Sequence, residues 1–247
     1  MNFYKLFKEI NFRFLSFINL FFPKNERKIV LYGRKMFNDN LEAMLVHFIN
    51  NNYTKKYKIY CLLAEPKVYE SKYKNENIYF VSGILSSIFH LLSSKYIFHT
   101  HSLSVVAFKA CRNQKIFNLW HGSPLKRMGN YKKDSKKPVG ARSDNYLLVT
   151  SKFFIPISME SYGHTEEQIF LGGNPRNDLL FSDKNCKEML GINNQYDKII
   201  LFMPTFRKSK IINRIDSTSD FPIISSKNIS EINSFLKENK VLLVIKP

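Results

Sequence analysis

A histidine in a tight turn is the best candidate for chemistry in this sequence. His121 lies in the segment Trp-His-Gly-Ser-Pro, directly after a strand-like stretch. An imidazole takes up a proton near neutral pH, so His121 is suited to general-base work. The alternative is a histidine that hydrogen-bonds locally and merely fixes the turn, and an isolated His-Gly pair favours that alternative.

The residues after His121 suit an anion. Ser123 is a good N-cap and Pro124 a good first helical residue, so a helix is predicted to start here. The N–H groups of a helix start attract phosphate, and Lys126 and Arg127 would add positive charge. We therefore predict a phosphate site beside the histidine.

A second turn, Gly-Gly-Asn-Pro-Arg-Asn-Asp at residues 172–178, has similar features. Its two glycines permit a sharp bend and a close backbone approach. Arg176 is suited to bidentate recognition of phosphate or carboxylate. Asn177 or Asp178 is predicted to cap the helix that follows. A plain capped turn with a surface arginine explains the same residues equally well.

A third turn, Met-Pro-Thr-Phe-Arg at residues 203–207, offers the hydroxyl of Thr205 and the guanidinium of Arg207. By itself this signal is weak. His99 and His101 alternate on a strand and so share one face, but the sequence shows no third ligand near them. We predict neither a metal nor another cofactor.

Hydrophobic patterning indicates the scaffold that positions these turns. Short apolar stretches alternate with helical patterns such as residues 40–50. The predicted strands are residues 28–33, 57–64, 77–82, 95–100, 115–120 and 144–150. This alternation predicts an α/β fold in which helices cover both faces of a parallel sheet. Ligands of such sheets bind beyond the carboxyl ends of the strands, where the three turns fall.

The chain becomes polar around residues 182–197, which predicts a connection between two domains, 25–185 and 186–247. The second begins with a strand from residue 198, followed by a helix over 228–239 and a closing strand. A strand–helix–strand unit cannot bury both faces of its own sheet. This piece therefore either extends the first domain or begins a second domain that is cut short.

Residues 1–24 have apolar side chains at helical spacing, with Lys8 and Arg13 tending to the other side. The apolar run is shorter than the ~20 residues that span a bilayer. One interpretation is an amphipathic basic helix that lies on an anionic membrane surface. The alternative is an ordinary first helix that docks on the domain.

Composition narrows the classes of partner. Hydrophobic residues make up 44% of the 247 residues, which is enough for a folded core. Three widely spaced cysteines fit a reducing compartment. The net charge of +18 suits nucleic acid, an anionic membrane or a phosphorylated substrate, although part of it reflects a general bias in composition. No nucleic-acid-binding motif is present, so no nucleic-acid partner is predicted.

Four segments, taken in order, resemble the CDP-glycerol glycerophosphotransferase family of teichoic-acid-type glycerol-phosphate primases and polymerases. They are "QKIFNLWHGSPLKRMG", "SDNYLLVTSKFF", "FLGGNPRNDLL" and "ILFMPTFR", and the resemblance covers roughly residues 95–247. It implies a GT-B-like α/β fold with a Rossmann-like, acceptor-side N-terminal domain and a nucleotide-binding second one, here incomplete. It also implies a peripheral location on the cytoplasmic face of the cell membrane.

The resemblance assigns roles to the turns. His121 matches the proposed catalytic base of the family's Trp-His-Gly-Thr-Pro motif, with Ser123 in place of threonine. Arg176 and Arg207 fall on the family's Pro-Arg-Asn-Asp and Pro-Thr-Phe-Arg motifs. With the bottom-up candidates, the predicted substrate-binding residues are Trp120, Gly122, Ser123, Lys126, Arg176, Asn177, Asp178, Thr205 and Arg207.

The implied substrates are CDP-glycerol or a related CDP-alditol and a lipid-linked acceptor. Family members continue beyond the closing Lys-Pro with a second functional histidine and a serine-rich nucleotide-binding segment. We therefore expect a truncated chain that binds CDP-glycerol poorly. Three alternatives stay open: a ribitol-phosphate donor, a nucleotide-sugar donor of another GT-B enzyme, and an inactive membrane-peripheral remnant.

Overall fold

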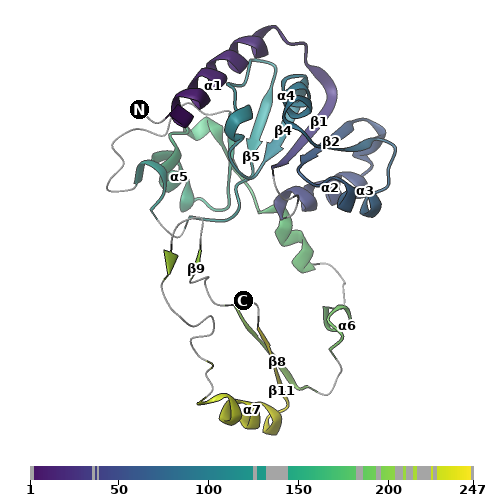
Figure 1. Ribbon diagram of the computed structural model, residues 1–247, viewed down its shortest axis with the longest axis vertical. Coiled ribbons are helices and arrows are strands. Elements are labelled where there is room, and N and C mark those ends of the chain that lie inside the picture. Colours follow the sequence, from purple (N-terminus) through teal and green to yellow (C-terminus); the bar gives the residue numbers. More distant parts are fainter. Residues whose placement is uncertain are drawn as a thin grey trace. The chain divides into compact units, whose positions relative to one another are not determined.

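The computed structural model describes residues 3–34, 37, 39–124, 127–131, 144–181, 186–192, 196–203, 208–209, 214–215, 224 and 227–245 (Figure 1). The chain divides into two compact units, residues 1–182 and 183–247.

A parallel sheet organises the first unit. Among the described residues its seven strands are β1 (Asn25–Arg34), β2 (Lys58–Leu63), β3 (Ile78–Val81), β4 (Ser94–His99), β5 (Lys115–Asn118), β6 (Tyr146–Val149) and β7 (Ile169–Leu171). Their order is β3-β2-β1-β4-β5-β6-β7, and every neighbouring pair is parallel. The order reverses between β1 and β4, which makes that junction the topological switch point of the sheet.

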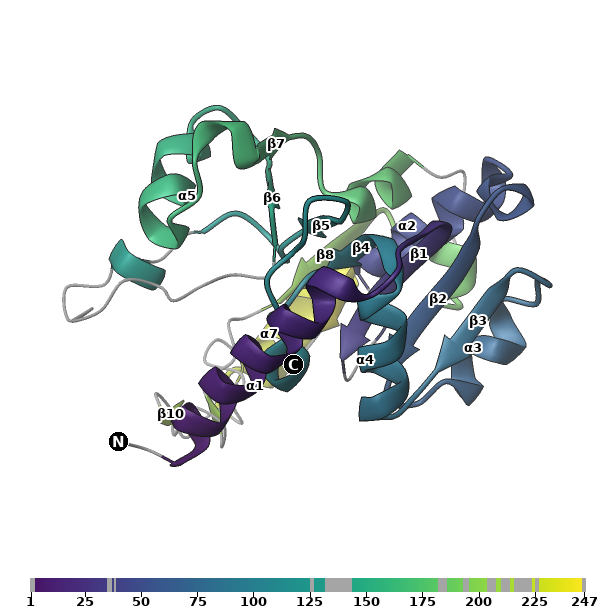
Figure 2. The same ribbon diagram turned by 90° about the horizontal axis from the view of Figure 1, so that it is seen from above.

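Helices cover both faces of this sheet, as the sequence predicts. They are α1 (Phe3–Phe21), α2 (Asn40–Asn50), α3 (Lys67–Lys72), α4 (Ile84–Leu92) and α5 (Phe154–Tyr162). Short 3₁₀ turns connect them: η1 (Tyr53–Lys55), η2 (Ser104–Val106), η3 (Gly129–Tyr131), η4 (Glu166–Gln168) and η5 (Pro175–Phe181). Figure 2 shows α1 and α4 running close together over the sheet.

Alternation along β1 explains the two layers. Ile29 and Leu31 are buried with α2, whereas Val30, between them, is buried with α1 and α4. Successive side chains of a strand point to opposite faces, so a continuous apolar run is required when both faces are covered. The first unit therefore has a hydrophobic layer on each face of the sheet.

The second unit has little core of its own. Strand β8 (Lys198–Phe202) pairs in parallel with β11 (Val241–Ile245), and β9 (Lys208–Ser209) pairs antiparallel with β10 (Arg214–Ile215). Its helices are α6 (Cys186–Met189) and α7 (Ile229–Glu238). Ile200 and Leu201 are about half exposed, which agrees with the expectation that such a unit cannot cover its own sheet.

Helix α1 combines a docked side with an exposed apolar stripe. It docks through the buried Leu15 and through Asn19, whose Nδ2 donates to Gln114 Oε1 at 2.6 Å. The predicted stripe lies outside: Phe14, Phe17 and Phe21 are 60%, 63% and 74% exposed. Among the described residues, none of the helices is both long enough and apolar enough to cross a membrane.

Candidate functional site

The predicted histidine lies at the switch point of the sheet. Asp39 and Asn40 follow β1, His101 follows β4, and Trp120 and His121 follow β5. Because these strands are parallel neighbours, their carboxyl ends meet at one edge. The crevice beyond that edge is where open α/β sheets bind their ligands.

Trp120 has a strained backbone that its neighbours hold in place. Its φ is 52°, which is uncommon for a bulky residue. Its N–H donates to Asn118 Oδ1 at 3.0 Å, and its carbonyl accepts from Asn40 Nδ2 at 3.0 Å. Strain that is fixed from two sides is a feature of functional turns. The turn therefore presents His121 in one defined orientation.

The imidazole of His121 stacks on two other rings. Its centroid lies 4.4 Å from that of Trp120 and 4.9 Å from that of His101. Burial lowers the pKa of His121, and the charges of His101 and Arg176 act in the same direction, whereas Asp39 opposes them. The lowered pKa favours the neutral imidazole, the form that accepts a proton.

Arg176, which lies in η5 much later in the chain, contacts the same turn. Its Nη1 lies 2.6 Å from Asp39 Oδ1 and 2.8 Å from Asp39 Oδ2. A Cβ built on Gly122, whose φ is 138°, would meet Arg176 Nη2 at 3.3 Å. Glycine at this position thus supplies both the backbone conformation and the room for the guanidinium.

Asn40 links the two turns and is a residue that our sequence reasoning missed. Its side chain is fully buried. Its Nδ2 donates to Trp120 O and, at 3.4 Å, to Asn174 Oδ1, while its Oδ1 accepts from Arg176 N at 3.2 Å. In the sequence, Asp39-Asn40 before an apolar helix resembles an ordinary helix cap. However, the Asp39 side chain makes no capping hydrogen bond.

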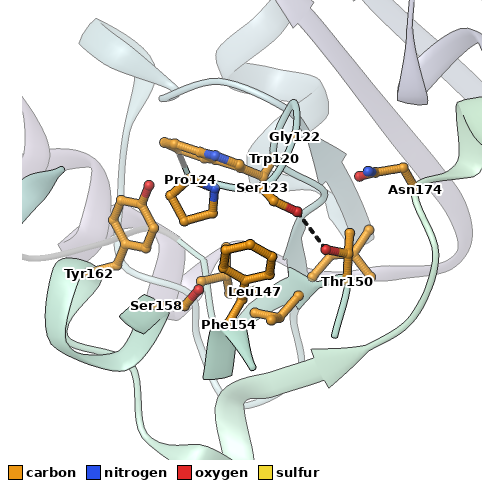
Figure 3. A pocket seen from close by; sticks show the side chains of 12 residues that line it. Trp120, Gly122, Ser123, Pro124, Leu147, Thr150, Phe154, Ser158, Tyr162 and Asn174 are labelled. Atoms are coloured by element: carbon orange, nitrogen blue, oxygen red, sulfur yellow. Dashed lines mark hydrogen bonds between the residues drawn. The ribbon is translucent and has the colours of Figure 1, made fainter. Parts of the chain in front are cut away.

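The helix predicted to start at Ser123 is wrong for the residues described. Residues 123–124 and 127–128 are not helical, and Lys126 lies outside the described residues. Ser123 Oγ instead hydrogen-bonds Thr150 Oγ1 at 2.7 Å, which ties the turn to the end of β6 (Figure 3). The phosphate site predicted beside His121 therefore lacks the N–H groups of a helix start among the described residues.

A small pocket lies behind this turn. Figure 3 shows Trp120, Pro124, Phe154 and Tyr162 around it, with Asn174 near its other end. Its volume of about 20 Å³ is enough for a water molecule but not for a substrate. The pocket thus forms part of the support of the turn and is too small to be the substrate site.

The second predicted turn, residues 172–178, lacks the helix cap that the sequence predicts. Asn177 and Asp178 lie within η5 and are exposed, so they do not cap a following helix. Asn174, which the sequence reasoning passed over, contacts Asn40 instead. Of the other predicted residues, Thr205 and Arg207 lie outside the described residues.

A buried hydrogen bond joins His164 to Asp144, just before β6. His164 Nε2 is 2.9 Å from Asp144 Oδ2, and both side chains are nearly inaccessible to solvent. His99 is buried and its Nδ1 donates to His101 O at 2.7 Å. Burial raises the pKa of Asp144, but the hydrogen bond from His164 and the charge of His99 outweigh it, so the net pKa is lowered. In the described part of the chain, no cluster of His, Cys, Asp and Glu side chains could hold a metal ion.

Comparisons with known proteins agree with the motifs. The chain is 27% identical over 205 residues to the teichoic acid poly(glycerol phosphate) polymerase of Bacillus spizizenii, covering 75% of this chain and 51% of that protein. It is 27% identical to the teichoic acid glycerol-phosphate primase of Bacillus subtilis, covering 78% and 55%. It is 26% identical to the ribitol-phosphate polymerase TarL of Staphylococcus aureus, covering 76% and 35%. The chain thus spans about half or less of these relatives.

The fold matches solved structures of the wall teichoic acid polymerase TagF. The TM-score is 0.68 at 17% sequence identity, covering 97% of this chain and 60% of the TagF chain. The predicted GT-B-like α/β fold is thereby confirmed. The model of the CDP-glycerol:poly(glycerophosphate) glycerophosphotransferase family matches residues 14–246. The chain belongs to this family.

Proposed function

We propose that the protein transfers glycerol phosphate from CDP-glycerol to a hydroxyl of a lipid-linked or other membrane-linked acceptor and releases CMP. The observation that carries the proposal is the ring-stacked His121 beside the Arg176 guanidinium, in surroundings that lower the pKa of the imidazole. Family membership supplies the donor class. One TagF structure was obtained after a soak with CDPG, which supports a CDP-linked donor.

In the proposed step, His121 accepts the proton of the acceptor hydroxyl. The oxygen attacks the β-phosphorus of CDP-glycerol, a new P–O bond forms, and the bond to the bridging oxygen breaks so that CMP leaves. Such phosphoryl transfer depends mainly on positioning and on cations around the phosphates. Arg176 is the described cation beside His121, and Lys126, Thr205 and Arg207 are proposed to add contacts to the donor.

Ribitol phosphate is the second candidate group for transfer, because TarL is among the relatives. The two donors differ by hydroxyl-bearing carbons and share the CMP leaving group, so the same site chemistry serves both. The choice between them is a matter of measurement.

The test is CMP release from CDP-glycerol and from CDP-ribitol by the purified protein, with a lipid-linked glycerol-phosphate acceptor present. We expect release with CDP-glycerol that requires the acceptor. Release with CDP-ribitol alone would replace the donor in the proposal. No acceptor-dependent release from either donor would contradict the proposed function.

We also propose that α1 binds the cytoplasmic face of the cell membrane. Its exposed apolar stripe follows a heptad spacing and consists of five exposed side chains, those of Phe7, Ile10, Phe14, Phe17 and Phe21. Exposed apolar stripes of this length are typical of helices that lie in a lipid interface. The Phe22 ring also contacts Phe89 of α4, where Leu85 is 83% exposed, so the apolar surface extends beyond α1.

Replacing Phe14, Phe17 and Phe21 together with serine is expected to weaken binding to anionic vesicles by about 100-fold. Each exposed phenylalanine contributes about 1 kcal/mol or more when buried in lipid, and 1.4 kcal/mol corresponds to tenfold. The measurement is flotation with phosphatidylglycerol vesicles. Leu180→Ser with Phe181→Ser, residues of η5 that are even more exposed than these phenylalanines, is the control. Equal flotation of both variants would reject α1 as the anchor.

A further inference from the structure

We propose that Asp39 is a positioning residue: its carboxylate holds the Arg176 guanidinium against the Gly122 turn and balances the arginine's charge beside His121. This inference deepens the proposed function and rests on it for its catalytic meaning. Neither Asp39 nor its neighbour Asn40 is suggested by the motifs, the first of which begins at Gln114.

The geometry of the ion pair supports a positioning role. Both carboxylate oxygens of Asp39 lie within 2.8 Å of one nitrogen, Arg176 Nη1. The contact leaves the guanidinium only partly exposed, and its Nη2 faces Gly122. A charged pair with these short distances fixes a side chain that would otherwise adopt many rotamers.

Hydrogen bonds of the neighbouring residue hold the backbone at Asp39 in an unusual conformation. Asp39 has a φ of 63°, a conformation that costs free energy for a residue with a Cβ. The next residue, Asn40, has a fully buried side chain that bonds the Trp120 carbonyl and the Arg176 N–H. Asn40 therefore fixes the backbones of both turns, and Asp39 fixes the arginine side chain between them.

The charges facing His121 come from three elements. They are Asp39 before α2, His101 after β4 and Arg176 in η5. The positive groups disfavour the imidazolium, and the carboxylate favours it. When one partner of the Asp39–Arg176 pair is removed, the charge of the other is no longer balanced and acts more strongly on His121. Loss of Asp39 and loss of Arg176 must then move the titration of His121 in opposite directions.

The experiment is a histidine titration by NMR of the full chain, which requires no activity. His121 is assigned by the resonance missing from His121→Gln. We expect Asp39→Asn to move the His121 titration to lower pH and Arg176→Gln to higher pH, each by a few tenths of a unit to about one unit. The double variant should return it toward the wild-type position. Glu42→Gln is the matched control, since Glu42 lies in the same helical turn but bonds Lys72 and Tyr73.

Activity gives the second readout. Asp39→Asn should lower CMP release about tenfold or more, because a misplaced cation is costly in phosphoryl transfer, and combining it with Arg176→Gln should cost little beyond the worse single variant. Shifts of the His121 titration in the same direction for both single variants, or none beyond that of Glu42→Gln, would overturn the proposal. A wild-type protein that releases no CMP would refute the proposed function instead, and the titration would still decide the role of Asp39.

Discussion

Replacing His121 with alanine is expected to lower CMP release from CDP-glycerol by a factor of about 10² to 10⁴, the usual contribution of a positioned general base. The imidazole is exposed, so its loss creates no cavity in the core. The free energy of unfolding should therefore change little. The measurement is steady-state CMP release, with urea unfolding of the same preparation.

His47→Ala is the control for this prediction. His47 is an exposed histidine of α2, so its loss tests whether any histidine substitution impairs the protein. It should leave CMP release unchanged. Wild-type activity should also fall off at a lower pH than an ordinary imidazole base would require, because burial lowers the pKa of His121. Normal turnover by His121→Ala would contradict the assignment of the base.

Replacing Asp144 with alanine is expected to lower the free energy of unfolding by about 3–5 kcal/mol, because it leaves His164 buried without its partner. Both side chains of the pair are almost fully buried. Asp144 comes directly before β6, the strand whose end holds Ser123 through Thr150. The measurement is urea unfolding at pH 7.

The pH dependence of this effect has a definite sign. The folded state lowers the pKa of Asp144, so its stabilising contribution is present above the ordinary value of 3.8 and is lost as the pH falls through the folded pKa. The difference in stability between wild type and Asp144→Ala should therefore shrink in acid. Glu26→Ala, which removes an exposed carboxylate paired with Lys95, should leave the unfolding midpoint nearly unchanged. A loss in Asp144→Ala no larger than in this control would contradict the prediction.

Local pattern was a sound guide to the elements. The helix predicted over residues 40–50 is α2, and each predicted strand overlaps an observed one. The strands could be identified in the sequence because both faces of a parallel sheet are buried, which requires continuous apolar runs. The same pattern placed the turns of His121 and Arg176 at the carboxyl ends of strands.

Local sequence pattern did not predict the hydrogen-bond partner of a capping-type side chain when a tertiary partner was also within reach. Ser123-Pro124 is a favourable helix start by type, yet Ser123 bonds Thr150, a residue of the next strand end. Asp39 is a favourable cap by type, yet its carboxylate bonds Arg176. Capping preferences amount to about 1 kcal/mol, so a tertiary partner readily outweighs them.

The sequence by itself determined the main strands, helices such as α2 and α7, and the two residue types that carry the proposed chemistry, because hydrophobic period and turn composition are local properties. The tertiary structure alone decided that Asp39 and Asn40 belong to the same site. They lie 137 and 136 residues before Arg176, and the contact exists because η5, which follows the edge strand β7, packs against α2, which follows β1. Strand order depends on how whole faces pack together, and no short segment encodes it.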